Sequence, residues 1–178
     1  MPITPTDSRI LGYLGRALSL EYTAVQQYMT QASLCDAWGL REAGERFRHE
    51  SVEEMQHAQR IIERMLQLGV APNASRLEAV GLAPDLAGML QRDAALESRI
   101  IALYDEAARY CRSVRDVENA GFFEALLGEE VSHAGQIHAW IANHDGRSEG
   151  ARNRAATPEG ARNRAASRNR GGNHAAFW

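Results

Sequence analysis

Six side chains in the sequence stand at spacings that suit metal binding. Glu54 and His57 are three residues apart, and Glu130 and His133 repeat this Glu-x-x-His pattern further along the chain. Residues three apart on a helix lie on adjacent turns of one face, so both members of a pair can reach one ion. With two more glutamates, the candidate metal ligands are Glu21, Glu54, His57, Glu97, Glu130 and His133.

The candidate ligands fall into two copies of one arrangement. Glu21 precedes Glu54 by 33 residues, and Glu97 precedes Glu130 by the same 33 residues. The first glutamate of each copy also has a leucine seven residues before it, a tyrosine seven residues after it and a cysteine fourteen residues after it. These neighbours are Leu14, Tyr28 and Cys35 in the first copy, and Leu90, Tyr104 and Cys111 in the second. A single Glu-x-x-His arises easily by chance, whereas two copies in one register indicate a shared role.

Electrostatics indicates what would make such a cluster tolerable inside a protein. Four buried carboxylates repel one another, and each loses several kcal/mol of hydration. Two divalent cations balance the charge of four carboxylates, and two neutral imidazoles complete their coordination. Carboxylate and imidazole ligands without thiolate favour iron or manganese over a structural zinc site. The pattern therefore predicts a buried di-metal centre.

Four long segments with helical periodicity carry these residues. Apolar positions recur every three or four residues on either side of each glutamate, which places the candidate ligands on inward stripes. The expected helices run from residue 6 or 7 to 38, from 40 to 69, from 84 to 112 and from 115 to 143, with Gly146 as the last stop. Short links predict two antiparallel hairpins, and the connection of about 15 residues between them must cross the length of the bundle. Strand patterns are absent, so the predicted fold class is an all-α four-helix bundle.

Composition divides the chain after residue 146. Residues 1–146 form the expected bundle domain, and residues 147–178, in which EGARNRAATP is nearly repeated as EGARNRAASR, form a tail predicted to be disordered. The tail has seven Arg and two Glu, a charge of +5, so the net charge of −3 leaves −8 on the bundle. The acidic bundle, and Arg repeats without interleaved aromatic residues, argue against a nucleic-acid partner. No membrane span or secretory signal is expected, and two isolated cysteines fit reduced thiols in the cytoplasm.

The sequence resembles the bacterioferritins, the haem-containing branch of the ferritins. The similarity spans residues 8 to 143 and is densest in ALSLEYTAVQQY, HESVEEMQHAQRIIERML, RDAALE and GEEVSH. It implies a ferritin-like bundle whose six candidate ligands bind two irons in a ferroxidase centre, with Glu54 and Glu130 bridging the ions. It also implies oxidation of Fe²⁺ by O₂ or H₂O₂, and storage of Fe³⁺ as mineral in a shell of twenty-four chains built from two-fold dimers. A reductase partner would release the iron.

The resemblance extends to residues outside this set of six. Met55 matches the methionine that binds haem b, one from each chain of a two-fold dimer; an ordinary apolar contact between chains is the alternative. His49 and Glu53 match residues that, in some bacterioferritins, bind a further iron on the inner surface of the shell. A solvated pair four residues apart explains them equally well. Glu50 and Asp93, each four residues before a candidate ligand, would make supporting hydrogen bonds or mark an iron path.

Several features leave alternatives open. Tyr28 would hydrogen-bond a bridging carboxylate or, in the second interpretation, donate an electron. The Arg-Asn-Arg repeat stands where the family has an apolar fifth helix lining a four-fold channel, which leaves the shell size undecided. Other functions to consider are a manganese catalase or another peroxide-reducing relative, and a haem-holding shell subunit with an idle centre. One further role to consider for the tail, which ends in Phe177 and Trp178, is to dock the protein as cargo in a larger compartment.

Overall fold

The computed structural model describes residues 7–72 and 76–156, with side chains described as far as residue 143. Its helices are α1 (Ser8–Ala37), α2 (Arg41–Gln67), α3 (Leu86–Ser113) and α4 (Val117–Ala156), and the described residues contain no strand. The all-α fold class is confirmed. The chain divides into two compact units, Met1–His138 and Ala139–Trp178, and every candidate ligand lies in the first. None of the described helices is long and apolar enough to cross a membrane.

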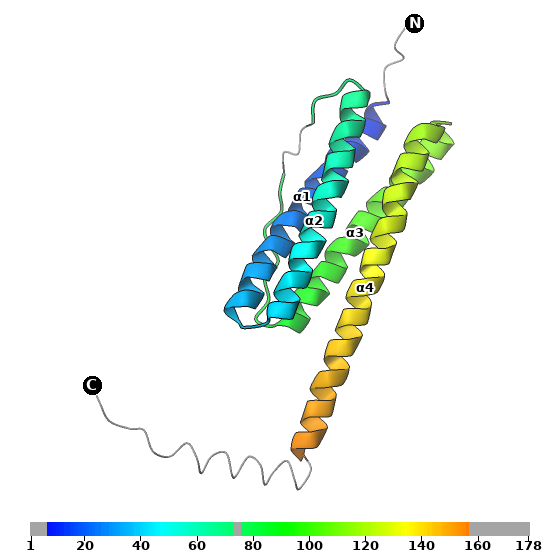
Figure 1. The fold of residues 1–178 in the computed structure, drawn as a ribbon. Helices are drawn as coiled ribbons and strands as arrows, with labels where there is room; N and C mark the ends of the chain where they lie inside the picture. The colour runs from blue at the N-terminus through cyan, green and yellow to red at the C-terminus, as the bar shows by residue number, and fades with distance from the viewer. Residues whose placement is uncertain (1–6, 73–75, 157–178) are drawn as a thin grey trace, which may run out of the picture. The chain divides into compact units, whose positions relative to one another are not determined.

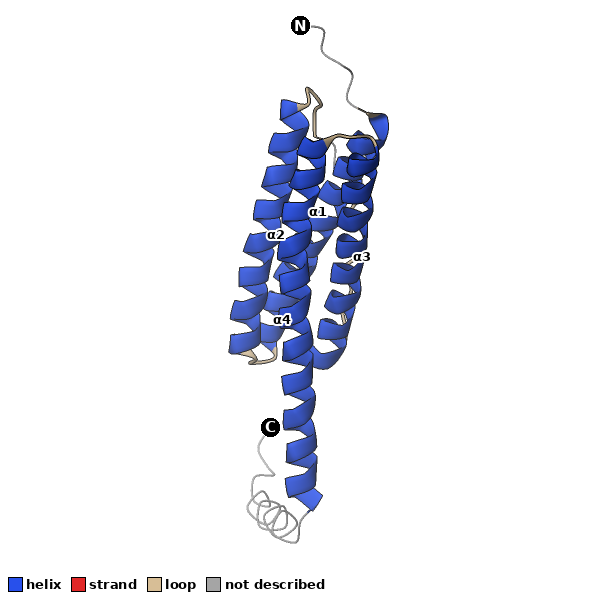
Figure 2. Ribbon diagram, turned by 90° about the vertical axis from the view of Figure 1, so that its right-hand side faces the viewer, coloured by secondary structure: helices blue, strands red, loops and turns tan. Residues whose placement is uncertain are grey.

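The first unit consists of two helical hairpins. Helices α1 and α2 are antiparallel and are joined by residues 38–40, and α3 and α4 are joined in the same way by residues 114–116 (Figure 1). The connection from α2 to α3 runs back along the bundle, so α2 and α3 point in the same direction (Figure 1). This long crossover is the topology of the ferritin-like bundles. In Figure 2 the helices of this unit lie side by side.

Local sequence explains where most helices begin and end. Asp7 caps α1 by accepting a hydrogen bond from the Arg9 amide at 2.8 Å, and Asp85 caps α3 through the Gly88 amide at 2.8 Å. Gly39, which follows α1, has a φ of 77°, a conformation that glycine adopts without strain. Arg115, expected to open α4, has a φ of 63°, so it lies in the turn and the helix starts at Val117.

The end of α4 differs from the sequence prediction. The helix does not stop at Gly146 but continues to Ala156. Glycine in a helix interior costs only about 1 kcal/mol relative to alanine, and the neighbouring Arg, Glu and Ala residues favour helix. The predicted domain boundary at residue 146 therefore falls inside a helix. The predicted disorder concerns residues 147–178, of which 157–178 lie outside the described residues.

The connection between the hairpins is held along the bundle by polar contacts. The Gly81 amide donates to Gln27 Oε1 at 3.0 Å, and the Glu78 amide donates to Thr23 Oγ1 at 3.2 Å. Arg99 on α3 pairs with the Glu78 carboxylate through both terminal nitrogens. These contacts position the crossover against α1 and α3, the two helices that contribute a glutamate but no histidine to the candidate ligands.

Candidate metal centre

Each helix places one glutamate at the centre of the bundle. The side chains of Glu21, Glu54, Glu97 and Glu130, from α1 to α4 in order, are all 0% exposed. Leucine, isoleucine and phenylalanine side chains are buried along the same helices, so the carboxylates lie inside an otherwise apolar core. A carboxylate withdrawn from water in this way requires cations or hydrogen-bond donors around it.

The two candidate histidines face this cluster through the same ring atom. His57 Nδ1 lies 2.6 Å from Glu130 Oε1 and 3.2 Å from Glu54 Oε2. His133 Nδ1 lies 3.4 Å from Glu54 Oε1 and 3.9 Å from Glu130 Oε2. The two imidazole rings stack with centroids 5.5 Å apart. Ligand atoms of Glu54, His57, Glu130 and His133 all lie within 4.8 Å of one another, so these four residues could hold one ion between them.

The two remaining glutamates are each bound by a tyrosine from the other hairpin. Tyr28 on α1 donates its phenol hydrogen to Glu97 on α3, and Tyr104 on α3 donates to Glu21 on α1. The sequence placed Tyr28 on a bridging carboxylate, which was assigned as Glu54 or Glu130. The structure corrects this, since the acceptor is Glu97. No role was predicted for Tyr104, although its place seven residues after Glu97 repeats that of Tyr28 after Glu21.

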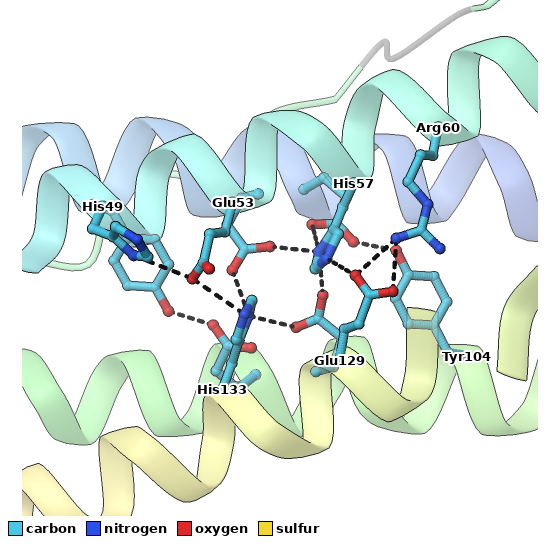
Figure 3. Close-up of polar contacts among 12 residues, drawn as sticks. His49, Glu53, His57, Arg60, Tyr104, Glu129 and His133 are labelled. Atoms are coloured by element: carbon cyan, nitrogen blue, oxygen red, sulfur yellow. Dashed lines mark hydrogen bonds and ion pairs between the residues drawn. The ribbon is translucent and has the colours of Figure 1, made fainter. Parts of the chain in front are cut away.

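The outer nitrogen of each imidazole contacts a second carboxylate. His57 Nε2 lies 3.0 Å from Glu129 Oε2, and His133 Nε2 lies 3.3 Å from Glu53 Oε2. Figure 3 shows the crossed arrangement: the carboxylate beside each histidine comes from the facing helix, α4 for His57 and α2 for His133. A carboxylate at Nε2 fixes the ring so that Nδ1 points inward. Glu129 was missed by the sequence analysis, although it directly precedes Glu130 as Glu53 directly precedes Glu54.

The surroundings of the two outer carboxylates differ. Arg60 Nη1 contacts both oxygens of Glu129, at 2.8 and 2.7 Å, whereas Glu53 lies 3.4 Å from His49 Nδ1 (Figure 3). The side chain of His49 is 71% exposed. A polar recess of about 240 Å³ opens here, lined by Glu53, Gln56, His57, Glu129, Ser132, His133 and Gln136. This recess lies directly against both imidazole rings.

Two further acidic residues, Glu50 and Asp93, are also buried. Side-chain oxygen or nitrogen atoms of Glu50, Glu53 and His133 lie within 4.8 Å of one another, and Glu50 Oε1 is 3.7 Å from Arg46 Nε. Asp93 Oδ1 accepts hydrogen bonds from Gln27 at 2.6 Å and Gln31 at 2.8 Å. Burial raises the pKa of Asp93 to about 7, against the effect of the two amide donors. The hydrogen bonds of Asp93 thus join it to two glutamine side chains of α1 and not to a candidate ligand, so these contacts do not give it the supporting role that was expected.

Burial and mutual contact shift the protonation of the cluster. Burial opposes a charge on His57, but the close carboxylates of Glu130 and Glu54 outweigh it and raise the pKa of His57 to about 10. The nearby Glu54 carboxylate raises the pKa of His133 to about 9 in spite of burial. Burial and the nearby charges of Glu54 and Glu130 raise the pKa values of Glu21 and Glu97 far above the usual range. Without metal, both histidines are therefore protonated at neutral pH. The upward shift of the Glu21 and Glu97 pKa values favours the neutral form of these two carboxyls.

Met55 lies outside this cluster. Its side chain is 44% exposed, and Val52, one turn earlier on α2, is 55% exposed. The helix rotation that separates Met55 from Glu54 places the thioether on the outer surface of the bundle. The structure therefore does not bring Met55 together with the six candidate ligands.

Residues 11–146 match the model of the Ferritin family, described as a ferritin-like domain. Among similar proteins is a bacterioferritin of Rhodobacter capsulatus, 34% identical over 139 residues, which are 78% of this chain and 86% of that protein. The chain belongs to the bacterioferritin family. A second bacterioferritin, from Mycolicibacterium paratuberculosis, is 33% identical over 127 residues, 71% of this chain and 80% of that protein.

The fold comparison agrees with this membership. The solved structure of the Rhodobacter capsulatus bacterioferritin has a TM-score of 0.77 to this chain at 34% identity and covers 80% of this chain and 89% of the other. That protein is described as having a metal-free dinuclear site and a haem iron in a crystallographic special position. The resemblance found in the sequence is confirmed at the level of family and fold.

Proposed function

We propose that this chain binds two Fe²⁺ ions at the buried glutamate–histidine cluster, oxidises them with O₂ or H₂O₂, and stores the Fe³⁺ in a shell built from copies of itself. Membership of the bacterioferritins supports iron storage and iron oxidation in general. The observation that carries the assignment to this site is the convergence of one buried glutamate from every helix with two histidines that face them.

The donor atoms present suit iron. Buried oxygens of Glu21, Glu54, Glu97 and Glu130 make no hydrogen bond, and neither does His133 Nδ1. Buried polar atoms without partners are rare in folded proteins, and a bound cation would satisfy them. The set contains carboxylate oxygens and imidazole nitrogens, while the thiols Cys35 and Cys111 are buried elsewhere in the core. Oxygen and nitrogen ligands of this kind fit Fe²⁺ or Mn²⁺.

The contacts support the following role for each side chain. His57 and His133 would each bind one ion through Nδ1, and Glu129 and Glu53 would hold the two rings in place through Nε2. Glu54 and Glu130 lie between the two histidines and would bridge the ions. Glu21 and Glu97 would bind one ion each, with their second oxygens held by Tyr104 and Tyr28. Oxidation removes one electron from each Fe²⁺, and the polar recess beside the imidazoles is the route by which iron would arrive.

Two other assignments remain proposals. An exposed methionine can ligate a group outside its own chain, so Met55 would bind haem b together with the same residue of a second chain in a two-fold dimer. His49 and Glu53 would bind a further iron, a role that competes with the contact between Glu53 and His133. The twenty-four-chain shell, the reductase partner and the cytoplasmic location stay predictions.

Anaerobic titration with Fe²⁺ followed by mixing with O₂ or H₂O₂ tests the function. We expect two Fe²⁺ to bind per chain and to be oxidised in a fast phase before mineral grows. Glu130→Ala should abolish that phase, because its carboxylate contacts both histidine sites. Glu45→Ala, at an exposed position on the same unit, serves as the matched control. A fast phase that survives in Glu130→Ala would refute the site. Oxidation with Mn²⁺ but not Fe²⁺ would favour the manganese alternative.

A further inference from the structure

A series of aromatic rings leads away from the metal centre inside the first unit. Tyr104, which hydrogen-bonds Glu21, lies 6.1 Å from Phe123 between ring centroids. Phe123 lies 6.3 Å from Tyr13 in an edge-to-face arrangement, and Tyr13 lies 5.8 Å from Tyr110. Tyr104, Phe123 and Tyr13 are fully buried, whereas Tyr110 is partly exposed. The series therefore connects the buried centre with solvent.

Every tyrosine of this series donates its phenol hydrogen to a carboxylate. Tyr104 donates to Glu21, Tyr13 donates to Glu106 at 2.7 Å, and Tyr110 donates to Asp7 at 2.6 Å. Ring contacts alone would be ordinary core packing. A proton acceptor at each phenol is a separate feature, because a tyrosine that loses one electron must also lose its proton to form the neutral radical.

Arg9 adds a second constraint at the outer end of the series. Its guanidinium carbon lies 4.4 Å from the centroid of the Tyr110 ring and 5.7 Å from that of Tyr13, and Nε donates to the Tyr13 oxygen at 3.1 Å. A cation beside a ring disfavours positive charge on that ring. An electron can therefore leave Tyr13 or Tyr110 only if the phenol proton leaves with it, and Glu106 and Asp7 are placed to accept that proton.

We propose that Tyr104, Phe123, Tyr13 and Tyr110 form an electron-transfer route between the metal centre and the surface. The proposal rests on the function proposed above. Reduction of H₂O₂ to water takes two electrons, and a centre that holds a single Fe²⁺ supplies only one of them. The Tyr104 phenol proton passes to the Glu21 carboxylate, so one H₂O₂, one Fe²⁺, one electron from Tyr104 and two protons from solvent yield two water molecules, Fe³⁺, the Tyr104 radical and protonated Glu21. The route disposes of an oxidant that would otherwise damage the core.

The radical moves outward by exchange of one electron and local proton shifts. Tyr104 regains an electron from Tyr13 across Phe123 and its proton from Glu21, while the Tyr13 proton passes to Glu106. Tyr13 is restored in the same way by Tyr110, whose proton passes to Asp7. A further Fe²⁺ ion in solution reduces the Tyr110 radical, and the Asp7 proton returns to the phenol.

The test traps the radical where the route ends. The full chain is loaded anaerobically with one Fe²⁺ per chain and mixed with H₂O₂ and a nitroso spin trap, and mass spectrometry locates the adduct. Fe³⁺ absorbance is recorded in the same samples. We expect an adduct on Tyr110 in the unaltered protein, and its loss in Tyr13→Phe and in Tyr104→Phe, which keep the rings in place. Tyr22→Phe, the same change at a tyrosine outside the series, should leave the adduct unchanged.

Three results would overturn the electron-transfer route, and they separate its failure from failure of the ferroxidase function. Tyr13→Phe leaves the centre intact, so an adduct that persists on Tyr110 in this variant means that the radical reached Tyr110 from solvent, and the proposal is wrong. Fe³⁺ formation in the unaltered protein without a Tyr110 adduct also overturns the route while leaving the ferroxidase function standing. Absence of Fe³⁺ overturns the ferroxidase function and the route with it. Thermal melting of each variant verifies that the bundle is folded.

Discussion

Metal binding to the centre should release protons, because His57 and His133 are protonated at neutral pH in the metal-free state. Contacts with Glu54 and Glu130 raise the pKa of His57 to about 10 and that of His133 to about 9, against the effect of burial on both rings. Burial and the nearby charges of Glu54 and Glu130 raise the pKa values of Glu21 and Glu97, which favours their neutral forms. A divalent ion requires neutral imidazole and ionised carboxylate as ligands. Each imidazole must therefore give up one proton when two ions bind, and any proton on Glu21 or Glu97 must leave as well.

The magnitude follows from this count. One proton each from His57 and His133 makes two protons for two ions at neutral pH, and Glu21 and Glu97 can only add to this number. Binding of the two ions should then strengthen by a factor of at least about 10² per pH unit, or roughly 3 kcal/mol. This slope should flatten at alkaline pH, where the histidines lose their protons before metal is added.

The assay is calorimetry with Zn²⁺ or Mn²⁺ in two buffers of different ionisation enthalpy, which gives the number of protons released without redox chemistry. His133→Ala should release about one proton fewer, since the protonated imidazole is removed. Glu45→Gln, at an exposed position, should behave as the unaltered chain. Release of fewer than two protons for each pair of ions would refute protonation of both histidines in the metal-free centre.

Three other predictions concern stability and the groups around the centre. Metal-free protein should melt at progressively lower temperature as the pH rises from about 6.5 toward 10, because His57, His133, Glu21 and Glu97 bind more protons folded than unfolded; a melting temperature that rises over this range would contradict it. Glu129→Ala should weaken metal binding about 10- to 100-fold by freeing the His57 ring, as measured by competition with a chelator, whereas Glu45→Ala should not. Gln27→Ala should lower the free energy of unfolding by about 1–3 kcal/mol, because Asp93 and the Gly81 amide both lose a partner; denaturant titration beside Gln26→Ala, at an exposed position, checks this.

The arrangement of the bundle could be predicted because the sequence repeats itself. Two hairpins with glutamates 33 residues apart must place those glutamates at matching depths, and helical periodicity then turns them inward. The convergence of Glu21, Glu54, Glu97 and Glu130 follows from these two facts. The end of α4 could not be predicted in this way, because Gly146 is compatible with helix when its neighbours are good helix formers.

The side-chain contacts between helices far apart in the sequence could not be predicted. The partner of Tyr28 depends on which carboxylate of the other hairpin lies at its depth, and the structure selects Glu97. The ion pair between Arg60 and Glu129 joins residues that are 69 positions apart in the sequence. From the sequence alone, both residues look like ordinary solvated charges on a helix surface. The orientation of the histidine rings depends on these outer contacts, so Nδ1 could not be identified as the inward atom from spacing alone.

The crossed tyrosine–glutamate bonds have a consequence for how such a centre can arise. Tyr28 of the first hairpin holds Glu97 of the second, and Tyr104 of the second holds Glu21 of the first. Donor and acceptor exchange places between the halves, which is the relation across the axis of an isologous dimer. A single ancestral hairpin paired with its own copy would make both bonds at once. Gene duplication and fusion would then keep both bonds of the centre intact. The crossover between α2 and α3 would be the new segment that joins the two copies.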